Sequence, residues 1–388
     1  MDLPERVRHP LHLNRTHGLP MRSTRLPSAM RPCAVAMILW INSSALAEEP
    51  QELMVRADGQ TFIGLPIHWG ANQALLLDAT GRLHNWKLEN VAEFHLRDTP
   101  FRPESPAAAR ARVQRELGRG FRIEIVGPYV LATPIQSTSR WRERFVALYG
   151  GFLRWGAQRG WSLRRPDFPL VVVEFPSESD FRQAAAQEGV SLPPTAVGCY
   201  LPASNRCVLY TLSRDAGGTA ETEATVVHEA VHQLAFNTGV HSRTATNPLW
   251  FVEGLATMFE IPAVYDLRAG KRGQADQLHG YYLRVFQRGG GSTSELAGRL
   301  RRLVESDAMF SVETEQAYGL SWALTFYLTQ RHAAATARYV RRLAERKFGD
   351  VSAAQRRDDF IASFGRPPEH FAGPLHRYFS QQSLGNGN

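Results

Sequence analysis

Cysteine and lysine are scarce in this chain of 388 residues, which contains three of each. Three cysteines are too few for a disulfide-dense scaffold. Long apolar runs are also missing, because no stretch beyond the N-terminal region is long enough to cross a membrane. A hydrophobic content of 43% and a charged content of 21% are ordinary for a globular protein, and the length suits one large domain and one small one.

The basic residues are nearly all arginine, and the formal net charge is +8. No basic run is interleaved with aromatic residues, as a nucleic-acid surface would require. The cluster of Arg299, Arg301 and Arg302 is typical of a solvated helix face. We therefore predict no nucleic-acid partner.

The N-terminal 47 residues have the features of a secretory signal peptide. Basic residues precede an apolar core, Cys33 to Ile41, which ends in Ala45-Leu46-Ala47. This pattern predicts cleavage between Ala47 and Glu48 and a periplasmic or secreted protein that is not integral to the membrane after cleavage. A short membrane-proximal helix is the alternative. The segment before the core is long for a signal peptide, which makes Met21 and Met30 alternative candidates for the start.

Two cysteines remain after cleavage, Cys199 and Cys207, and they flank a segment that is typical of two strands around a turn. If the turn centres on Ala203, the two cysteines face each other across the strands. We therefore expect a disulfide in an oxidising compartment, with two buried free cysteines as the alternative.

The run His228-Glu229-Ala230-Val231-His232 carries most of the functional information. Two histidines four residues apart on a helix project from one face, so that both can bind one Zn²⁺ ion. The adjacent Glu229 can then take a proton from a metal-bound water, as in metalloproteases. Two core or surface histidines beside a chance glutamate are the alternative.

The surrounding residues favour a helix from Glu221 to Phe236, with Thr219 or Thr222 as its cap and Asn237-Thr238-Gly239 as its end. Its buried stripe is formed by Val227, Ala230, Val231, Leu234 and Ala235.

A catalytic zinc site needs a third protein ligand. The metzincin pattern fails, because Ala235 and Thr238 stand where its glycine and third histidine should be. Glu253 lies in a second, strongly apolar helical segment, where a buried carboxylate needs a partner such as a metal. The alternatives are a partly exposed glutamate or an ion pair, with Glu260 as a rival ligand or as a group that orients a histidine.

These motifs resemble those of the gluzincins, the thermolysin-like zinc peptidase clan. More narrowly, residues of about 120–380 resemble a secreted bacterial family of unassigned function, classed as peptidase-MA-like. The resemblance rests on residues 228–234, 237–239, 250–256, 199–206 and 317–324. It implies His228, His232 and Glu253 as zinc ligands and Glu229 as general base. One departure is Thr257, where many gluzincins carry an aspartate.

Along the chain, short strand candidates come first and helical patterns follow, which predicts an α+β fold with a thermolysin-like domain. Residues 48–100 read as a small β-barrel of the Src-homology type, suited to docking on an envelope partner. We expect a linker at 101–118, the zinc domain at 119–382 and a disordered tail at 383–388.

The function that we expect is therefore an exported zinc metallopeptidase that hydrolyses peptide or protein substrates, with Glu229 as general base. Tyr318 is the expected oxyanion donor, with His241 and His279 as alternatives and a core tyrosine as the plainer interpretation. The competing hypotheses are a catalytically inactive envelope scaffold and a zinc amidase that acts on cell-wall peptides.

Overall fold

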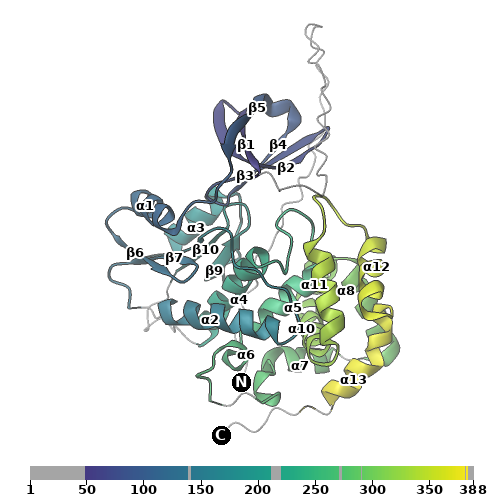
Figure 1. The fold of residues 1–388 in the computed structure, drawn as a ribbon. Coiled ribbons are helices and arrows are strands. Elements are labelled where there is room, and N and C mark those ends of the chain that lie inside the picture. Colours follow the sequence, from purple (N-terminus) through teal and green to yellow (C-terminus); the bar gives the residue numbers. More distant parts are fainter. Residues whose placement is uncertain are drawn as a thin grey trace.

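The computed structural model describes residues 49–138, 141–210, 220–270, 273–289, 291–380 and 382. A small sheet projects from one end of the molecule, and a second sheet with its covering helices forms the body (Figure 1). The mixed α+β class is confirmed. The predicted signal peptide, Thr219 and the tail at 383–388 lie outside the described residues. Within the described ranges, no helix is both long and apolar enough to span a bilayer.

The N-terminal sheet is a five-stranded antiparallel ladder in the order β4-β3-β2-β1-β5. The first hairpin turns at Asp58 and Gly59, whose φ angles of 50° and 76° suit the Asp-Gly type I′ turn. The strands are β1 (Gln51–Ala57), β2 (Gln60–Trp69), β3 (Gln73–Asp78), β4 (Leu83–Lys87) and β5 (Val91–Pro100), with the 3₁₀ turn η1 (Leu88–Asn90) between the last two.

The predicted strands are present, but the predicted closed barrel is not found: among the described strand pairs, none joins β4 to β5. The edge of β4 that is not paired with β3 contacts the second domain at its first residue. There the Leu83 amide donates a hydrogen bond to the Ala203 carbonyl at 2.8 Å. The Arg243 guanidinium donates hydrogen bonds across the same contact. One goes to the Gly81 carbonyl of the N-terminal domain at 2.8 Å, and the other goes to the Pro202 carbonyl of the second domain at 2.9 Å.

The predicted linker contains a helix, α1 (Pro106–Leu117). Ser105 caps it by accepting from the Ala108 amide, and Pro106 occupies the first turn, where its missing N–H costs nothing. Ala109 and Val113 are buried against the second sheet. The linker interpretation overlooked this serine-proline start before an alanine-rich stretch.

The second sheet has the order β6-β7-β8-β10-β9, with parallel pairs around β8 and antiparallel pairs at both edges. Helices cover both faces: α2 and α4 share one core cluster with it, and α1 and α3 share the other. The elements are β6 (Phe121–Val126), β7 (Tyr129–Pro134), α2 (Trp141–Ala157), β8 (Leu170–Phe175), α3 (Glu178–Gln187), β9 (Gly198–Leu201), β10 (Arg206–Tyr210) and α4 (Ala220–Asn237).

The disulfide prediction is wrong, because Cys199 and Cys207 are both buried free cysteines. In the β9–β10 hairpin, Cys207 pairs with Tyr200, and Cys199 pairs with Val208. The turn therefore centres one half-residue beyond Ala203, and a one-residue shift sends a side chain to the opposite face. Cys199 joins the core on one side of the sheet and Cys207 the core on the other.

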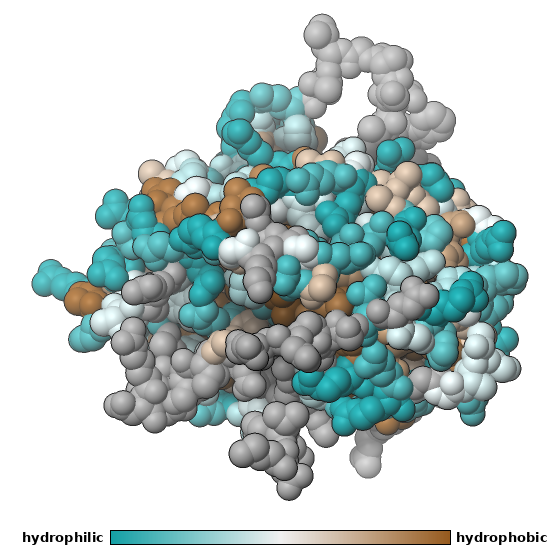
Figure 2. All heavy atoms as spheres, turned by 90° about the horizontal axis from the view of Figure 1, so that it is seen from below, coloured by the Kyte–Doolittle hydropathy of each residue, from teal (hydrophilic) through white to brown (hydrophobic). Residues whose placement is uncertain are grey.

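The C-terminal half is helical, as predicted. Figure 2 shows that hydrophilic residues cover most of the face seen from below, with hydrophobic residues in small groups. The elements are α5 (Leu249–Phe259), α6 (Pro262–Tyr265), η3 (Ala275–Gln277), α7 (Gly280–Arg288), α8 (Thr293–Glu305), α9 (Met309–Val312), α10 (Thr314–Arg331), α11 (Ala333–Ala344), α12 (Ala353–Phe364), η4 (Pro368–Phe371) and α13 (Ala372–Ser380).

Helices α5 and α10 pack unusually close together because of a glycine. A Cβ atom on Gly254 would lie 2.4 Å from the Ser321 carbonyl oxygen and 2.3 Å from the Thr325 hydroxyl. Only glycine fits at this crossing, since real Cβ atoms do not approach oxygen so closely. Tyr318, almost one turn before Ser321 on α10, interacts with Glu253, the residue before Gly254.

Candidate metal centre

Helix α4 carries the His-Glu-x-x-His run through the centre of the body, in contact with β9, β10, α2 and α5. The predicted apolar stripe is buried, as is every other residue of α4 from Thr225 to Asn237. His228 and His232 project together, with ring centroids 4.6 Å apart at an angle of 84°, and both are fully buried. The predicted shared face of the two histidines is confirmed.

The Glu253 carboxylate on α5 meets both imidazoles. Its Oε2 lies 3.2 Å from His228 Nε2, and its Oε1 lies 3.8 Å from His232 Nε2. Ligand atoms of a tetrahedral zinc site, each about 2.0–2.2 Å from the ion, lie about 3.3–3.6 Å from one another. The shorter of the two distances from Glu253 is close to this range and the longer lies slightly beyond it, so Glu253 is placed as a candidate third donor beside the two histidines.

Glu229 is also near, because His228, Glu229 and His232 can bring one ligand atom each within 4.8 Å of the others. Two carboxylates thus compete for the place of third ligand. Two observations favour Glu253 as the third ligand. Its carboxylate lies close to both imidazoles, and it comes from a different helix than the histidines. The Oε2 atom of Glu229 accepts a hydrogen bond from the Tyr200 amide at 2.8 Å.

Glu260 orients a histidine rather than joining the three donor groups. Its Oε1 lies 2.9 Å from His228 Nδ1, and its Oε2 lies 2.8 Å from His279 Nε2. A His228 Nδ1 proton shared with Glu260 would leave Nε2 available to a metal ion once its own proton is lost, which is the usual arrangement around metal-bound histidines. Burial alone would raise the pKa of Glu260, but hydrogen bonds from the two imidazoles hold that pKa well below its ordinary value.

Thr257 stands where the resemblance led us to expect an aspartate. Its hydroxyl donates to the carbonyls of Glu253 at 2.9 Å and Gly254 at 3.0 Å, within its own helix. Glu260, almost one turn further, provides the carboxylate that this threonine lacks.

The electrostatics of the centre favour a cation. Burial would lower the pKa of His228, but the carboxylates of Glu253 and Glu260 raise it to about 10. A buried imidazole between two carboxylates therefore retains positive charge at neutral pH. A divalent cation at Nε2 would satisfy the same negative charge, which is why metal binding and proton release are coupled at such sites.

A buried amide network positions the strand that contacts Glu229. Asn205 and Asn237 exchange two side-chain hydrogen bonds, at 2.9 Å and 2.7 Å. The Tyr200 hydroxyl donates to Asn205 Oδ1 at 3.0 Å, and Gln233 donates to the Asn205 carbonyl at 2.8 Å. Asn205 has a φ of 59°, a left-handed conformation that asparagine tolerates better than most residues.

Sequence reasoning missed this network, although Tyr200, Asn205 and Asn237 all lie in segments that carried the family resemblance. The Asn205-Arg206 turn between two apolar strands was a signal for a left-handed residue. Its pairing with the end of α4 depends on how the sheet packs against the helix, which the local pattern does not specify.

Tyr318 lies at the centre, as expected. It is buried on α10, and burial, followed by the charge of Glu253 and a hydrogen bond with it, raises the pKa of the Tyr318 hydroxyl well above its ordinary value. Its rivals have other surroundings. His241 packs between Phe236 and Phe251. His279 bonds Glu260 and also accepts from the Tyr282 amide at the start of α7.

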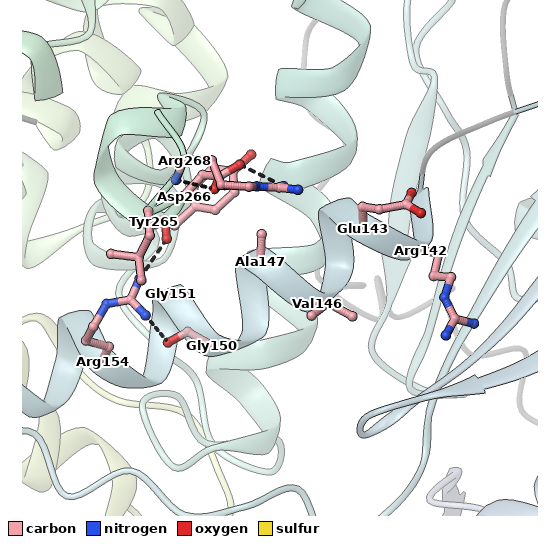
Figure 3. A pocket seen from close by; sticks show the side chains of 11 residues that line it. Arg142, Glu143, Val146, Ala147, Gly150, Gly151, Arg154, Tyr265, Asp266 and Arg268 are labelled. Carbon is pink, nitrogen blue, oxygen red and sulfur yellow. Dashed lines mark hydrogen bonds and ion pairs between the residues drawn. The ribbon is translucent and has the colours of Figure 1, made fainter. Parts of the chain in front are cut away.

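The groove in Figure 3 lies apart from this centre. It has a volume of about 480 Å³ and runs between α2 and residues 265–268, where Arg154 donates to the Tyr265 carbonyl and Arg268 pairs with Asp266. None of its lining residues belongs to the metal centre. The side chains of His228, Glu229, His232 and Glu253 are at most 1% exposed.

Comparison with known proteins adds a family without a known activity. Residues 222–349 match a family described as a protein of unknown function (DUF1570). The match covers about a third of the chain and includes both histidines, Glu229, Glu253, Glu260 and Tyr318. It does not include Tyr200 or Asn205. No curated protein matches the chain.

Proposed function

We propose that this chain is an exported zinc metallopeptidase of the thermolysin-like type, which hydrolyses peptide bonds in peptide or protein substrates. The observation that carries the proposal is the convergence of two Nε2 atoms and a carboxylate from a second helix, with Glu229 beside them. A site that only held a metal for structure would not need Glu229 next to the ligands.

His228, His232 and Glu253 would hold the metal in this proposal. Bound zinc supplies Lewis acidity toward a carbonyl oxygen and lowers the pKa of water toward about 7. Glu229 accepts the proton of the attacking water and passes it to the leaving amine. The amide of Tyr200 holds one oxygen of the Glu229 carboxylate and so sets its orientation.

Tyr318 is the proposed oxyanion donor. Because its pKa is raised, its hydroxyl keeps its proton at neutral pH and remains a hydrogen-bond donor. Its position beside Glu253 keeps this donor near the proposed ligands. Export through a cleaved signal peptide, with cleavage between Ala47 and Glu48, completes the proposal.

A second candidate, a catalytically inactive scaffold with a structural metal, is favoured by the burial of the centre. The proposed ligands are at most 1% exposed, so a substrate carbonyl needs an opening of the body to reach them. A zinc amidase for cell-wall peptides is a third candidate, which uses the same chemistry on another amide.

The test combines metal content with hydrolysis by the exported protein. We expect about one zinc per wild-type chain, a large loss of zinc in Glu253→Ala, and bound zinc without hydrolysis in Glu229→Gln. The control is Glu223→Gln. Glu223 lies on the same helix with a half-exposed side chain, and its substitution should change neither zinc content nor hydrolysis. Protein and peptidoglycan digests are assayed in parallel, which separates peptidase from amidase.

Hydrolysis retained by zinc-loaded Glu229→Gln would refute the mechanism. Bound zinc that stabilises the fold, without hydrolysis of either substrate, would favour the scaffold. Equal zinc in wild-type protein and Glu253→Ala would exclude Glu253 as the third ligand.

A further inference from the structure

Strand β5 forms an exposed edge of the N-terminal sheet. Among the described strand pairs, β5 has one neighbour, β1, and its other side has none. It is also one of the longest strands, Val91–Pro100, and nearly all its residues are exposed. An edge strand of this length presents a row of unpaired backbone groups, which is a template for pairing with another strand.

The edge is apolar as well as open. Phe94 is 50% exposed and Leu96 is 48% exposed, although their partners across β1, Val55 and Leu53, belong to the buried core. The two side chains therefore continue the core face of the sheet into solvent. A further strand added to β5 would cover both and extend the same core.

The sequence of the edge is complementary to itself. Around His95 the residues read Glu93-Phe94-His95-Leu96-Arg97. If two copies of β5 pair antiparallel about His95, Glu93 of one copy lies opposite Arg97 of the other. Phe94 then lies opposite Leu96, on the core face. Both pairs occur twice, as a two-fold symmetric contact requires.

Neighbouring registers lose this match. A shift by one residue in one direction sets Glu93 opposite Asp98, two like charges, and Phe94 opposite Arg97. A shift in the other direction sets Glu93 opposite Leu96. Opposite charges and apolar pairs directly across two strands stabilise a sheet, whereas like charges destabilise it. Of these three registers, the one centred on His95 alone pairs charge with charge and apolar with apolar.

We propose that two copies of this protein pair through β5 in this register, forming a continuous ten-stranded antiparallel sheet from the two five-stranded ones. In Figure 1, β5 lies at the end of the molecule remote from α7 and α13. Within one chain, Arg97 bonds Glu52 at 2.7 Å, and Arg56 lies 3.9 Å from Glu93. The side chains of Glu93 and Arg97 remain 54% and 37% exposed, and so can share a second partner across the edge.

Cysteine cross-linking of the full exported chain tests the register directly. In the proposed pairing only His95 faces its own copy, so His95→Cys should give a covalent dimer under copper-phenanthroline oxidation. The single variants Glu93→Cys and Arg97→Cys should not, but a mixture of the two should cross-link. The native Cys199 and Cys207 are buried and stay out of the reaction.

Sedimentation equilibrium tests the association without a cross-link. We expect the wild-type mass to double with concentration in the micromolar range. Glu93→Arg should raise the dimer Kd about tenfold at low salt, since it creates two like-charge pairs. Adding Arg97→Glu should restore dimerisation in part, because the swapped charges pair across the edge but face Arg56 and Glu52 within their own chain. Glu89→Arg makes the same charge change on the exposed η1 turn and should have no effect.

A monomer at all concentrations together with no cross-link through His95→Cys would overturn the proposal, and an edge that bound only a foreign strand would do the same. Cross-linking of Glu93→Cys to itself would overturn the register. Circular dichroism of each variant shows whether the sheet has remained folded.

Discussion

The two five-stranded sheets of this protein differ in what covers them. The N-terminal sheet has a small core cluster on one face, which includes Val55, Leu76 and Trp86, and on its other face Leu75 is also buried. The second sheet is covered by helices on both faces, and four successive β8 residues, 170–173, are buried. A sheet covered on both sides can hold a buried polar network in a fixed geometry. A sheet with an open edge is better suited to association.

The difference between the two sheets also accounts for the position of the candidate metal centre in the body. The second sheet contacts α4 through β9 and β10, and thereby holds the Tyr200 amide against Glu229. The N-terminal domain contacts the turn of the same hairpin on its outer side. There Leu83 donates a hydrogen bond to Ala203, and Arg243 of the body donates one to Gly81. Changes in the body should therefore affect both stability and metal binding, whereas equivalent changes in the N-terminal sheet should leave the metal in place.

The largest effect is expected where the body is packed most tightly. Gly254→Ala places a Cβ against the Ser321 carbonyl and should reduce the free energy of unfolding by about 3 kcal/mol or more, and should weaken zinc binding through Glu253. Gly150→Ala is the control, because a Cβ there meets nothing within 4 Å. It should be neutral or stabilise α2 by up to about 1 kcal/mol. Urea unfolding of both variants measures the difference, and equal stabilities would contradict the close approach of α5 and α10.

Substitution of one asparagine near each sheet compares the stability that their hydrogen bonds contribute. Asn237→Ala removes the acceptor of the buried Asn205 side-chain NH2 and one of the two donors to Asn205 Oδ1, and should cost about 2–3 kcal/mol. Asn85 bonds Gln73 at 2.7 Å on the exposed side of the N-terminal sheet, so Asn85→Ala should cost less than about 0.5 kcal/mol. Denaturant midpoints at pH 7 test both. Similar losses would mean that burial of the network contributes little.

Acid should destabilise the body through His241. Burial between aromatic rings lowers the pKa of His241 to about 3, below the value of about 6.5 in an unfolded chain. The unfolded state therefore binds more protons between these values. The stability contributed by neutral His241 is fully present above about pH 6.5 and is lost as the pH falls toward 3, by about 2 kcal/mol at pH 5.

The variant His241→Phe removes this proton linkage. Its unfolding free energy should fall less than that of the wild type between pH 7 and pH 5, as measured by urea titrations at each pH. Identical pH profiles for the two proteins would show that His241 is not buried in the neutral form.

The smallest effect is expected on the surface of the N-terminal sheet. Arg56 lies 3.9 Å from Glu93, and both side chains are more than half exposed. Arg56→Ala should change the free energy of unfolding by less than about 0.5 kcal/mol, because exposed ion pairs are weak and screened by salt. Thermal unfolding at two salt concentrations measures it, and a change above about 1 kcal/mol would mean that this sheet depends on its surface charges.

Much of the candidate centre was predictable because its signals are local. The spacing of His228 and His232, and the apolar stripe beside them, require only helical geometry. Glu253 was predictable because a carboxylate in an apolar helix needs a partner. The strands of the N-terminal sheet followed from turn residues and alternation, while α1 was missed although Ser105 and Pro106 marked its start.

The sequence by itself thus determined the helix that carries the His-Glu-x-x-His run, the shared face of its two histidines, the second helix with Glu253 and the α+β class, since each depends on residues within a few turns of one another. Three other features were decided by the tertiary structure. They are the opposite faces of Cys199 and Cys207, the open edge of β5, and the hydrogen bonds of Glu260 with His228 and His279. These features depend on strand register and on contacts between distant segments. A half-residue change in one turn, or a glycine at one helix crossing, is enough to redirect them.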